Sequence, residues 1–251
     1  MRMLTFAKRC AKEILRDPLN LAFGLGFPLV LILLLSAIQA NIPVSLFEIE
    51  HLTPGVTVFG LSFMTLFSAT LISKDRAGSL LRRLYTAPLS PLDFILAYTL
   101  PIIPISLAQG AFCYVVAIIL GLEVTVNILL AIVFMIPVSL LFIGLGLLFG
   151  IILSDKQVDG ICGALLTNLS AWLSGTWFDL EQVGGAFSAI AHALPFYHAV
   201  ELEQALFHGD FGTALPHLLV IALYSILAAG AAVKGYKVIL TMPDTMSEER
   251  R

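Results

Sequence analysis

Long apolar runs separated by short polar segments make up most of this chain. Six runs come close to or exceed the roughly 20 residues that a helix needs to cross a hydrocarbon core of about 30 Å. The pattern predicts an all-α integral membrane protein with six transmembrane helices in one domain, residues 1–251. The predicted spans are residues 21–40, 54–73, 94–120, 127–153, 159–177 and 217–237.

Residues 1–18, ahead of the first run, have the pattern of an amphipathic helix. They carry too many charges to span a membrane, and they lack the apolar core and the cleavage site of a signal peptide. We predict an interfacial helix that ends at Asp17 and Pro18, although its charges could serve only to set topology. The predicted apolar side is Leu4, Ala7, Ala11, Ile14 and Leu15, and the basic side is Lys8, Arg9, Lys12 and Arg16.

A charged stretch, residues 74–93, lies between the second and third runs. It predicts a short basic helix flat on one membrane face, which Pro88 stops. Ser90 is then a suitable N-cap for the third span, with Pro91 at the first helical position and Asp93 reaching back. Ala77, Leu80, Leu81, Leu84 and Tyr85 form the apolar stripe of the basic helix, and Arg76, Ser79, Arg82 and Arg83 occupy its other faces.

Three further features shape the predicted spans. Pro101 and Pro104 should kink the third span, and Gly146 and Gly150 in the fourth form a small-residue face suited to close packing, although such faces are common. Pro195 divides residues 178–216 into two apolar pieces, 183–194 and 196–207, each too short to cross. We predict two re-entrant half-helices, with Trp172, Trp177 and Tyr197 at the depth of the membrane interface.

Charge is scarce and strongly asymmetric. Hydrophobic residues make up 59% and charged residues 12% of the chain, which has a net charge of −3, and its mean hydropathy is +0.96. All 14 Lys and Arg lie in residues 1–20, 74–93, 234–251 or at Lys156. The alternate loops, 41–53, 121–126 and 178–216, contain eight of the 17 acidic residues and no Lys or Arg. Six spans with both termini in the cytoplasm satisfy the positive-inside rule.

The sequence lacks the residues that several kinds of transporter and enzyme usually require. No ionisable group lies in the middle third of a predicted span, which argues against ion-coupled carriers and voltage sensors. The chain has no P-loop, Gly-x-Ser-x-Gly or His-Glu-x-x-His motif, so we predict no catalytic residue, and energy for any work must come from another polypeptide. Cys10, Cys113 and Cys162 have no disulfide or metal-ligand spacing and are interpreted as packing residues.

The remaining polar groups allow two interpretations each. The five histidines sit outside the spans or at their outer edge, and with Glu201 and Glu203 nearby a metal site is conceivable, but their spacing matches no helical ligand pair and we predict none. Polar residues inside the spans form a candidate substrate path, or simply hydrogen-bond between helices, which we favour for any single one. These residues are Gln109, Thr167, Asn168 and Ser170.

Three blocks carry a resemblance to a known family. They are Arg16-Asp17-Pro18, the charged block Lys74-Asp75-Arg76-Ala77-Gly78-Ser79-Leu80 continued by Arg82-Arg83-Leu84 and Ala87-Pro88-Leu89-Ser90, and Ala193-Leu194-Pro195-Phe196-Tyr197-His198-Ala199-Val200. Over almost its full length the chain resembles the membrane (permease) subunit of a type-2 ATP-binding-cassette exporter.

The resemblance implies roles for these blocks. A connecting helix with Lys8, Arg9, Lys12 and Arg16 and a coupling helix would both rest on a separate ATPase subunit, and external helices with Pro195, Tyr197 and Glu201 would gate the exit. The family often has a basic residue shortly after Pro-x-Tyr, where this chain has Glu201 and Glu203, and usually an acidic one opening the coupling block, where it has Lys74-Asp75. The coupling residues would be Asp75, Arg76, Gly78, Ser79, Leu80, Arg82, Arg83, Leu84 and Pro88.

The resemblance also implies an assembly. Two copies of the chain and two ATPase subunits, which hold ATP and Mg²⁺, would work in a prokaryotic plasma membrane, with no nucleic-acid partner. Export of a drug-like or other small amphiphile is the first expectation, because the spans offer an uncharged apolar surface with few polar groups. Export of a lipid-linked glycan or of an antimicrobial peptide are alternatives within the family. A membrane scaffold or channel module without ATP coupling is the alternative from another class.

Overall fold

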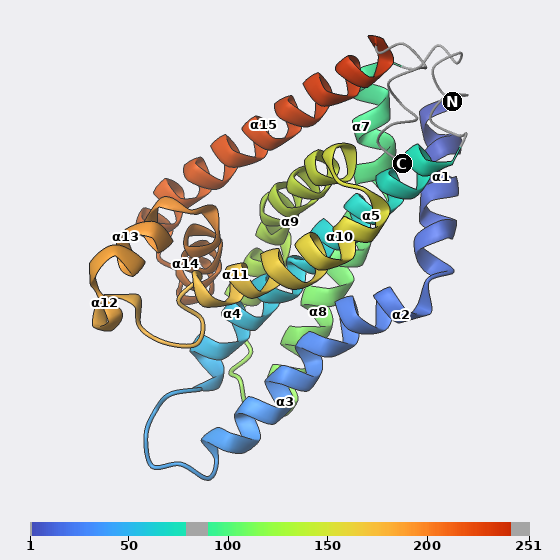
Figure 1. Cartoon of the computed structure of the whole chain (residues 1–251). Helices are drawn as coiled ribbons and strands as arrows, with labels where there is room; N and C mark the ends of the chain where they lie inside the picture. The colour runs from blue at the N-terminus through green and yellow to red at the C-terminus, as the bar shows by residue number, and fades with distance from the viewer. Residues whose placement is uncertain (1, 79–89, 242–251) are drawn as a thin grey trace.

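The computed structural model describes residues 2–78 and 90–241, and every element in these ranges is helical. The helices form an elongated bundle (Figure 1). We call the end that holds α1 and the last turns of α15 the terminal end, and the opposite end the far end. The elements are α1 (Arg2–Leu15), α2 (Pro18–Leu21), the π-helix η1 (Ala22–Gly26), α3 (Phe27–Gln39), α4 (Ile49–Leu61), α5 (Phe63–Ala77), α7 (Pro91–Thr99), α8 (Ile103–Ile119), α9 (Val126–Ile152), α10 (Asp155–Val158), the π-helix η2 (Asp159–Leu166), α11 (Thr167–Trp172), α12 (Leu180–Val183), α13 (Gly185–Ala193), α14 (Pro195–His208) and α15 (Phe211–Thr241).

Five helical stretches in the described residues are long and apolar enough to cross a membrane. They are Pro18–Gln39, Ile49–Ala77, Pro91–Ile119, Val126–Ile152 and Phe211–Val238. The predicted span 159–177 is not among them, since the continuous helix of α10, η2 and α11 has three charged residues near its start and ends at Trp172. That helix lies along the second span, with α10 against α5 and α11 against α4 and α14. A sixth crossing therefore stays a prediction.

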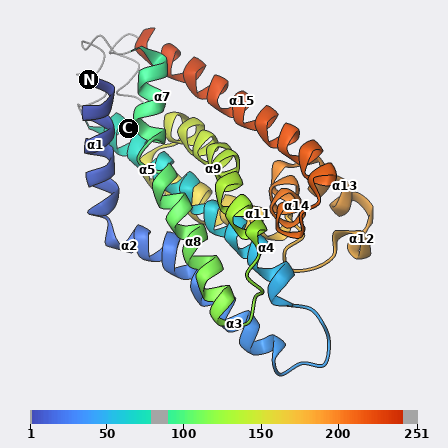
Figure 2. The same ribbon diagram turned by 180° about the vertical axis from the view of Figure 1, so that it is seen from behind.

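The second span, α4 with α5, forms the centre of the bundle, and all of its apolar window is buried. Its α5 part packs against α9 (Figure 2). The contact includes Gly146 and Gly150, the glycines that were predicted to allow close packing. A Cβ on Gly150 would lie 2.7 Å from the Ala69 carbonyl oxygen. The Thr65 hydroxyl donates to the Phe142 carbonyl at 2.9 Å across this contact. The Gly146–Gly150 face is thus a helix contact within the chain.

Local signals fix several helix ends as predicted. Ser90 and Asp93 form a capping box at the start of α7, with Pro91 at its first position. The third span breaks between α7 and α8, at Pro101, because proline lacks the N–H that would continue the helix. In the region of the predicted half-helices the structure has α13 and α14, with Pro195 beginning α14, and their entry into the membrane stays a prediction.

Other boundaries differ from prediction. The second span continues to Ala77 instead of ending at residue 73. Residues 74–77 are therefore the last turn of α5 and do not begin a separate helix. Gly78 follows in an extended conformation. The rest of the predicted basic helix, with Ser79, Leu80, Arg82, Arg83, Leu84 and Pro88, lies outside the described residues.

The buried face of α1 is also rotated from the predicted stripe. Leu4 and Leu15 are 56% and 65% exposed, whereas Phe6 and Cys10 are buried together with Ala7 and Ile14. The reason is that α1 packs against α7 and α5. The apolar side is therefore only partly covered by protein, and Leu4 and Leu15 remain exposed.

Candidate functional site

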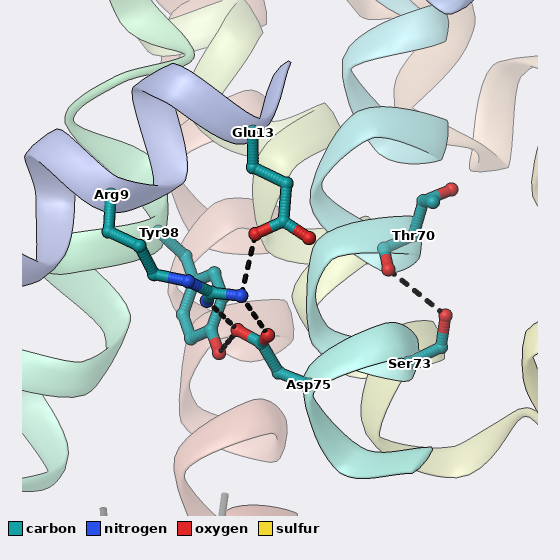
Figure 3. Close-up of polar contacts among 6 residues, drawn as sticks. All are labelled: Arg9, Glu13, Thr70, Ser73, Asp75 and Tyr98. Atoms are coloured by element: carbon teal, nitrogen blue, oxygen red, sulfur yellow. Dashed lines mark hydrogen bonds and ion pairs between the residues drawn. The ribbon is translucent and has the colours of Figure 1, made fainter. Parts of the chain in front are cut away.

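A buried carboxylate, Asp75 in the last turn of α5, organises the terminal end. Its side chain is only 3% exposed. Both terminal nitrogens of Arg9 on α1 donate to it, Nη1 to Oδ2 and Nη2 to Oδ1, the latter at 2.5 Å. The Tyr98 hydroxyl on α7 donates to Oδ2 at 2.7 Å. We call Arg9, Glu13, Asp75 and Tyr98 the polar junction (Figure 3).

The geometry of Arg9 makes this a strong contact. A guanidinium that donates two parallel hydrogen bonds to one carboxylate gives the most specific charged pair in proteins. Glu13, one turn further along α1, adds a second carboxylate 2.6 Å from Arg9 Nη2. Burial by itself would lower the pKa of Arg9, but the hydrogen bonds and the charge of Asp75 outweigh it, and the pKa lies above its ordinary value. Arg9 therefore stays charged.

Aromatic rings hold the Tyr98 hydroxyl in place. The ring meets Phe6 of α1 edge-on, with centroids 5.1 Å apart, and Phe94 of its own helix at 4.8 Å. Phe94 in turn stacks on Tyr236 of α15 at 3.9 Å. Such pairs contribute about 0.5–1.5 kcal/mol beyond the area that they bury. The junction thus connects α1, α5, α7 and α15.

The end of α5 makes three further polar contacts. Arg76 donates to the carbonyl oxygens of Ile151 and Leu153, which the end of α9 leaves without helical partners. Lys74 Nζ lies 3.8 Å from Asp17 Oδ2, at the turn between α1 and α2. The Ser73 hydroxyl donates to Asp155 of α10 at 3.0 Å. A movement of this helix end must therefore move its neighbours.

Cys10 provides a probe of the junction. Its side chain is buried, and desolvation, with the nearby charge of Asp75, raises the pKa of the thiol to about 12. Since the thiolate is the reactive form, Cys10 should react with a maleimide at pH 7 far more slowly than a free cysteine thiol does. Mass spectrometry of the intact protein after timed labelling measures this rate. Rapid labelling of Cys10 in the folded chain would contradict the enclosed junction.

The structure describes three of the predicted coupling residues, Asp75, Arg76 and Gly78. Asp75 is buried and enclosed by Arg9 and Tyr98, and its role in coupling to an ATPase subunit stays a prediction. Arg76 is half-buried and directed at α9. On the predicted connecting helix, Arg9 points inward, while the exposed side chains are those of Lys8, Lys12 and Arg16.

The predicted gate residues lie at the far end, away from the junction. Pro195 is buried at the start of α14. The Tyr197 ring rests on His192, with centroids 4.3 Å apart. Burial raises the pKa of Glu201. The His198 and His217 rings meet there through their Nδ1 atoms, 2.8 Å apart. Their role in gating stays a prediction.

The predicted substrate-path residues are not gathered in one place. Gln109 on α8 is buried and donates to the Thr57 carbonyl of α4 at 3.4 Å, a contact between helices as favoured above. Thr167, Asn168 and Ser170 instead bond to carbonyls of their own helical stretch, at 3.0, 2.8 and 2.8 Å. For these three, the interpretation as bonds between helices is wrong.

The apolar pattern alone did not single out Glu203, which is fully buried on α14. A usable signal exists in the sequence. Its neighbours at helical spacing of three and four residues are all apolar, so the carboxyl lies on the apolar face of its helix. They are Ala199, Val200, Leu206 and Phe207.

Comparison with known proteins identifies the family. The model of the ABC-2 type transporter membrane domain matches residues 1–207. Searches of curated proteins and of solved structures returned no match. The family match covers α1 to α14 and so includes both the polar junction and Glu203. The chain belongs to the ABC-2 type transporter family and is a membrane component of an ABC transporter.

Proposed function

We propose that the chain is the permease of an ATP-driven exporter and that the polar junction transmits movement from an ATPase subunit to the spans. One observation carries this proposal. Asp75 is bonded at once to Arg9 of α1 and to Tyr98 of α7. The helices α1 and α7 are far apart in the sequence. Their hydrogen bonds to the same carboxylate couple the movement of both helices to that of α5.

The place of residues 79–89 in the sequence explains why we assign the polar junction a role in transmitting movement. This segment leaves α5 after Gly78 and returns at Ser90, where α7 begins. Asp75 lies four residues before this segment and Tyr98 nine residues after it. Both side chains contact α1, Asp75 through Arg9 and Tyr98 through Phe6. A force on α1 or on the segment is therefore shared by α5 and α7. The family resemblance assigns these two elements to contact with the ATPase.

Charge distribution supports the orientation that this requires. The basic residues gather at the terminal end, and the positive-inside rule puts that end in the cytoplasm, where an ATPase subunit is found. In our proposal two copies of the chain and two ATPase subunits work in a prokaryotic plasma membrane. Because the chain has no P-loop, ATP and Mg²⁺ are bound by the ATPase. The cargo is a small amphiphile that moves outward.

Replacing both Arg82 and Arg83 with alanine should abolish transport and substrate-stimulated ATP hydrolysis without changing insertion or abundance. Lys74, Arg76 and the basic residues of α1 still keep that end positive. Removing charges at a protein contact costs about 2–5 kcal/mol when their partners are left unpaired. The measurement uses membrane vesicles in which the permease and its ATPase subunit are co-expressed.

Arg250→Ala, which removes one charge from the basic tail, is the control and should transport normally. Full transport by the double variant at equal abundance would leave the segment as a topological anchor. An isolated permease that conducts solutes without any ATPase subunit would favour the channel alternative. Selective stimulation of hydrolysis by a lipid-linked glycan or by a peptide would favour the other cargoes.

A further inference from the structure

The Glu203 carboxyl is the least expected polar group in the described residues. Its side chain is fully buried, and neither of its oxygens has a hydrogen-bond partner. Burial raises its pKa well above the ordinary range, because an apolar environment disfavours the charged form. Buried polar groups without partners are rare and costly. Ionisable residues at membrane depth usually serve a function.

A second unpaired group faces the same region from another helix. The Tyr114 hydroxyl of α8 is buried and has no partner in the described residues. Tyr114 packs in one buried cluster with Phe207 of α14, and the Tyr114 and Glu203 side chains do not hydrogen-bond to each other. The Tyr114 ring lies nearly parallel to that of Phe207, one turn after Glu203, with centroids 6.4 Å apart. A group with several N–H donors could satisfy both residues at once.

Among the described residues, no lysine or arginine side chain lies on the helices around this carboxyl. The helices α8 and α14 both pack on α4 and α9, and none of the four contains Lys or Arg. The other ionisable side chains of α4 and α14 are Glu50, His51, Tyr197, His198, Glu201 and His208. The next unpaired acceptor on α8 is the Gln109 amide oxygen, five residues before Tyr114. Its amide nitrogen is already directed at the Thr57 carbonyl and Cys113 Sγ.

We propose that Glu203 and Tyr114 form the recognition site for the protonated amine of a cationic amphiphile. The inference rests on the proposed export function and narrows its substrate class. The unpaired atoms are the two carboxyl oxygens of Glu203 and the Tyr114 hydroxyl oxygen, all of which accept hydrogen bonds from an ammonium group. The Tyr114 and Phe207 rings add the faces that attract a cation.

A movement of α14 would open this site without breaking a span. Leu194 and Pro195 begin α14, and Gly209 ends it at φ +78°, a left-handed conformation that favours glycine. The helix has 14 residues and is held by packing on α4, α9 and α15. Displacement of α14 as a unit would expose Glu203 and Tyr114 together. The amine would enter at that stage and supply the missing positive charge.

Carbodiimide labelling tests whether an amine occupies the site. Dicyclohexylcarbodiimide adds to a protonated carboxyl in apolar surroundings, and mass spectrometry locates the adduct. In the permease–ATPase complex in lipid nanodiscs, we expect labelling of Glu203 that dodecylammonium suppresses and dodecanol does not. Equal protection by both compounds, protection by neither, or no adduct at Glu203 would each overturn the proposal. This binding measurement needs no ATP hydrolysis, so it stands even if the export function is wrong.

Glu203→Gln keeps the shape of the protonated acid and removes only its ability to pair with a cation. We expect the dodecylammonium concentration that half-stimulates ATP hydrolysis to rise by about tenfold or more, since the amide oxygen can still accept a hydrogen bond but carries no charge to pair with the ammonium group. Stimulation by dodecanol should not change. Glu201→Gln, two residues earlier on α14, is the matched control. An unchanged dodecylammonium response in Glu203→Gln would show that the carboxyl acts only as a neutral packing group, against the proposal.

Discussion

Arg9→Ala should destabilise the purified permease and abolish export by the complex. The Asp75 carboxylate is 3% exposed in the wild-type chain, and without Arg9 the Tyr98 hydroxyl is its remaining hydrogen-bond partner among the described residues. A buried charge that loses its partner costs about 3–5 kcal/mol, and we expect the low end because Arg9 is itself 37% exposed. Thermal unfolding followed by size-exclusion chromatography in detergent measures the loss of stability. Transport into inverted vesicles measures the loss of coupling.

Adding a second substitution separates the effect on stability from the effect on export. In Arg9→Ala combined with Asp75→Asn no buried charge is left unpaired, since Glu13, the other carboxylate that Arg9 contacts, is 33% exposed. Stability should therefore largely return, as in a double-mutant cycle of coupled residues. Export should not return, because α1 no longer holds α5. Lys8→Ala, next to Arg9 but exposed, is the control for stability and should unfold at the wild-type temperature. Wild-type stability and transport in Arg9→Ala would mean that the polar junction contributes neither to the stability of the permease nor to transport.

Features with a local cause were predictable from sequence. The start of α7 depends on Ser90, Pro91 and Asp93 within one turn, and the breaks at Pro101 and Pro195 follow from the missing N–H of proline. The apolar runs are long enough to specify spans without knowledge of their neighbours. The same signals mispredicted the end of α5, because charged residues at a helix end read like the start of a separate surface helix.

The functional contacts were not predictable in this way. Arg9 and Asp75 are 66 positions apart, and nothing in the residues around either one indicates the other. The same explanation applies to the rotated face of α1, because Phe6 is buried by its contact with Tyr98, a residue far away in the sequence. The burial of Glu203, which the sequence analysis considered only as a metal ligand, was missed for a different reason. Glu203 lies on α14, outside the predicted spans, so a search of the spans for ionisable groups does not include it.

Gly146→Ala should be among the most damaging single substitutions in the spans. A Cβ at this position of α9 would lie 1.9 Å from Ser68 Oγ and 2.3 Å from the Thr65 carbonyl oxygen of α5. Neither distance is possible, so α9 must move away from the centre of the bundle and weaken the hydrogen bonds that Thr65 and Ser68 make to it. Overpacking of a close-packed interior costs about 1–3 kcal/mol. A lowered unfolding temperature in detergent and reduced abundance in membranes measure the effect.

The cause can be separated from a general intolerance of larger residues. Gly230→Ala on α15 is the matched control, because a Cβ there has no neighbour within 4 Å among the described residues, and its unfolding temperature should equal that of wild type. Ser68→Ala should fail to rescue Gly146→Ala. It removes the nearest side-chain oxygen, but the Thr65 carbonyl belongs to the backbone of α5 and cannot be trimmed away. Full rescue by Ser68→Ala would show that a side chain, and not the approach of the two helix backbones, requires glycine at position 146.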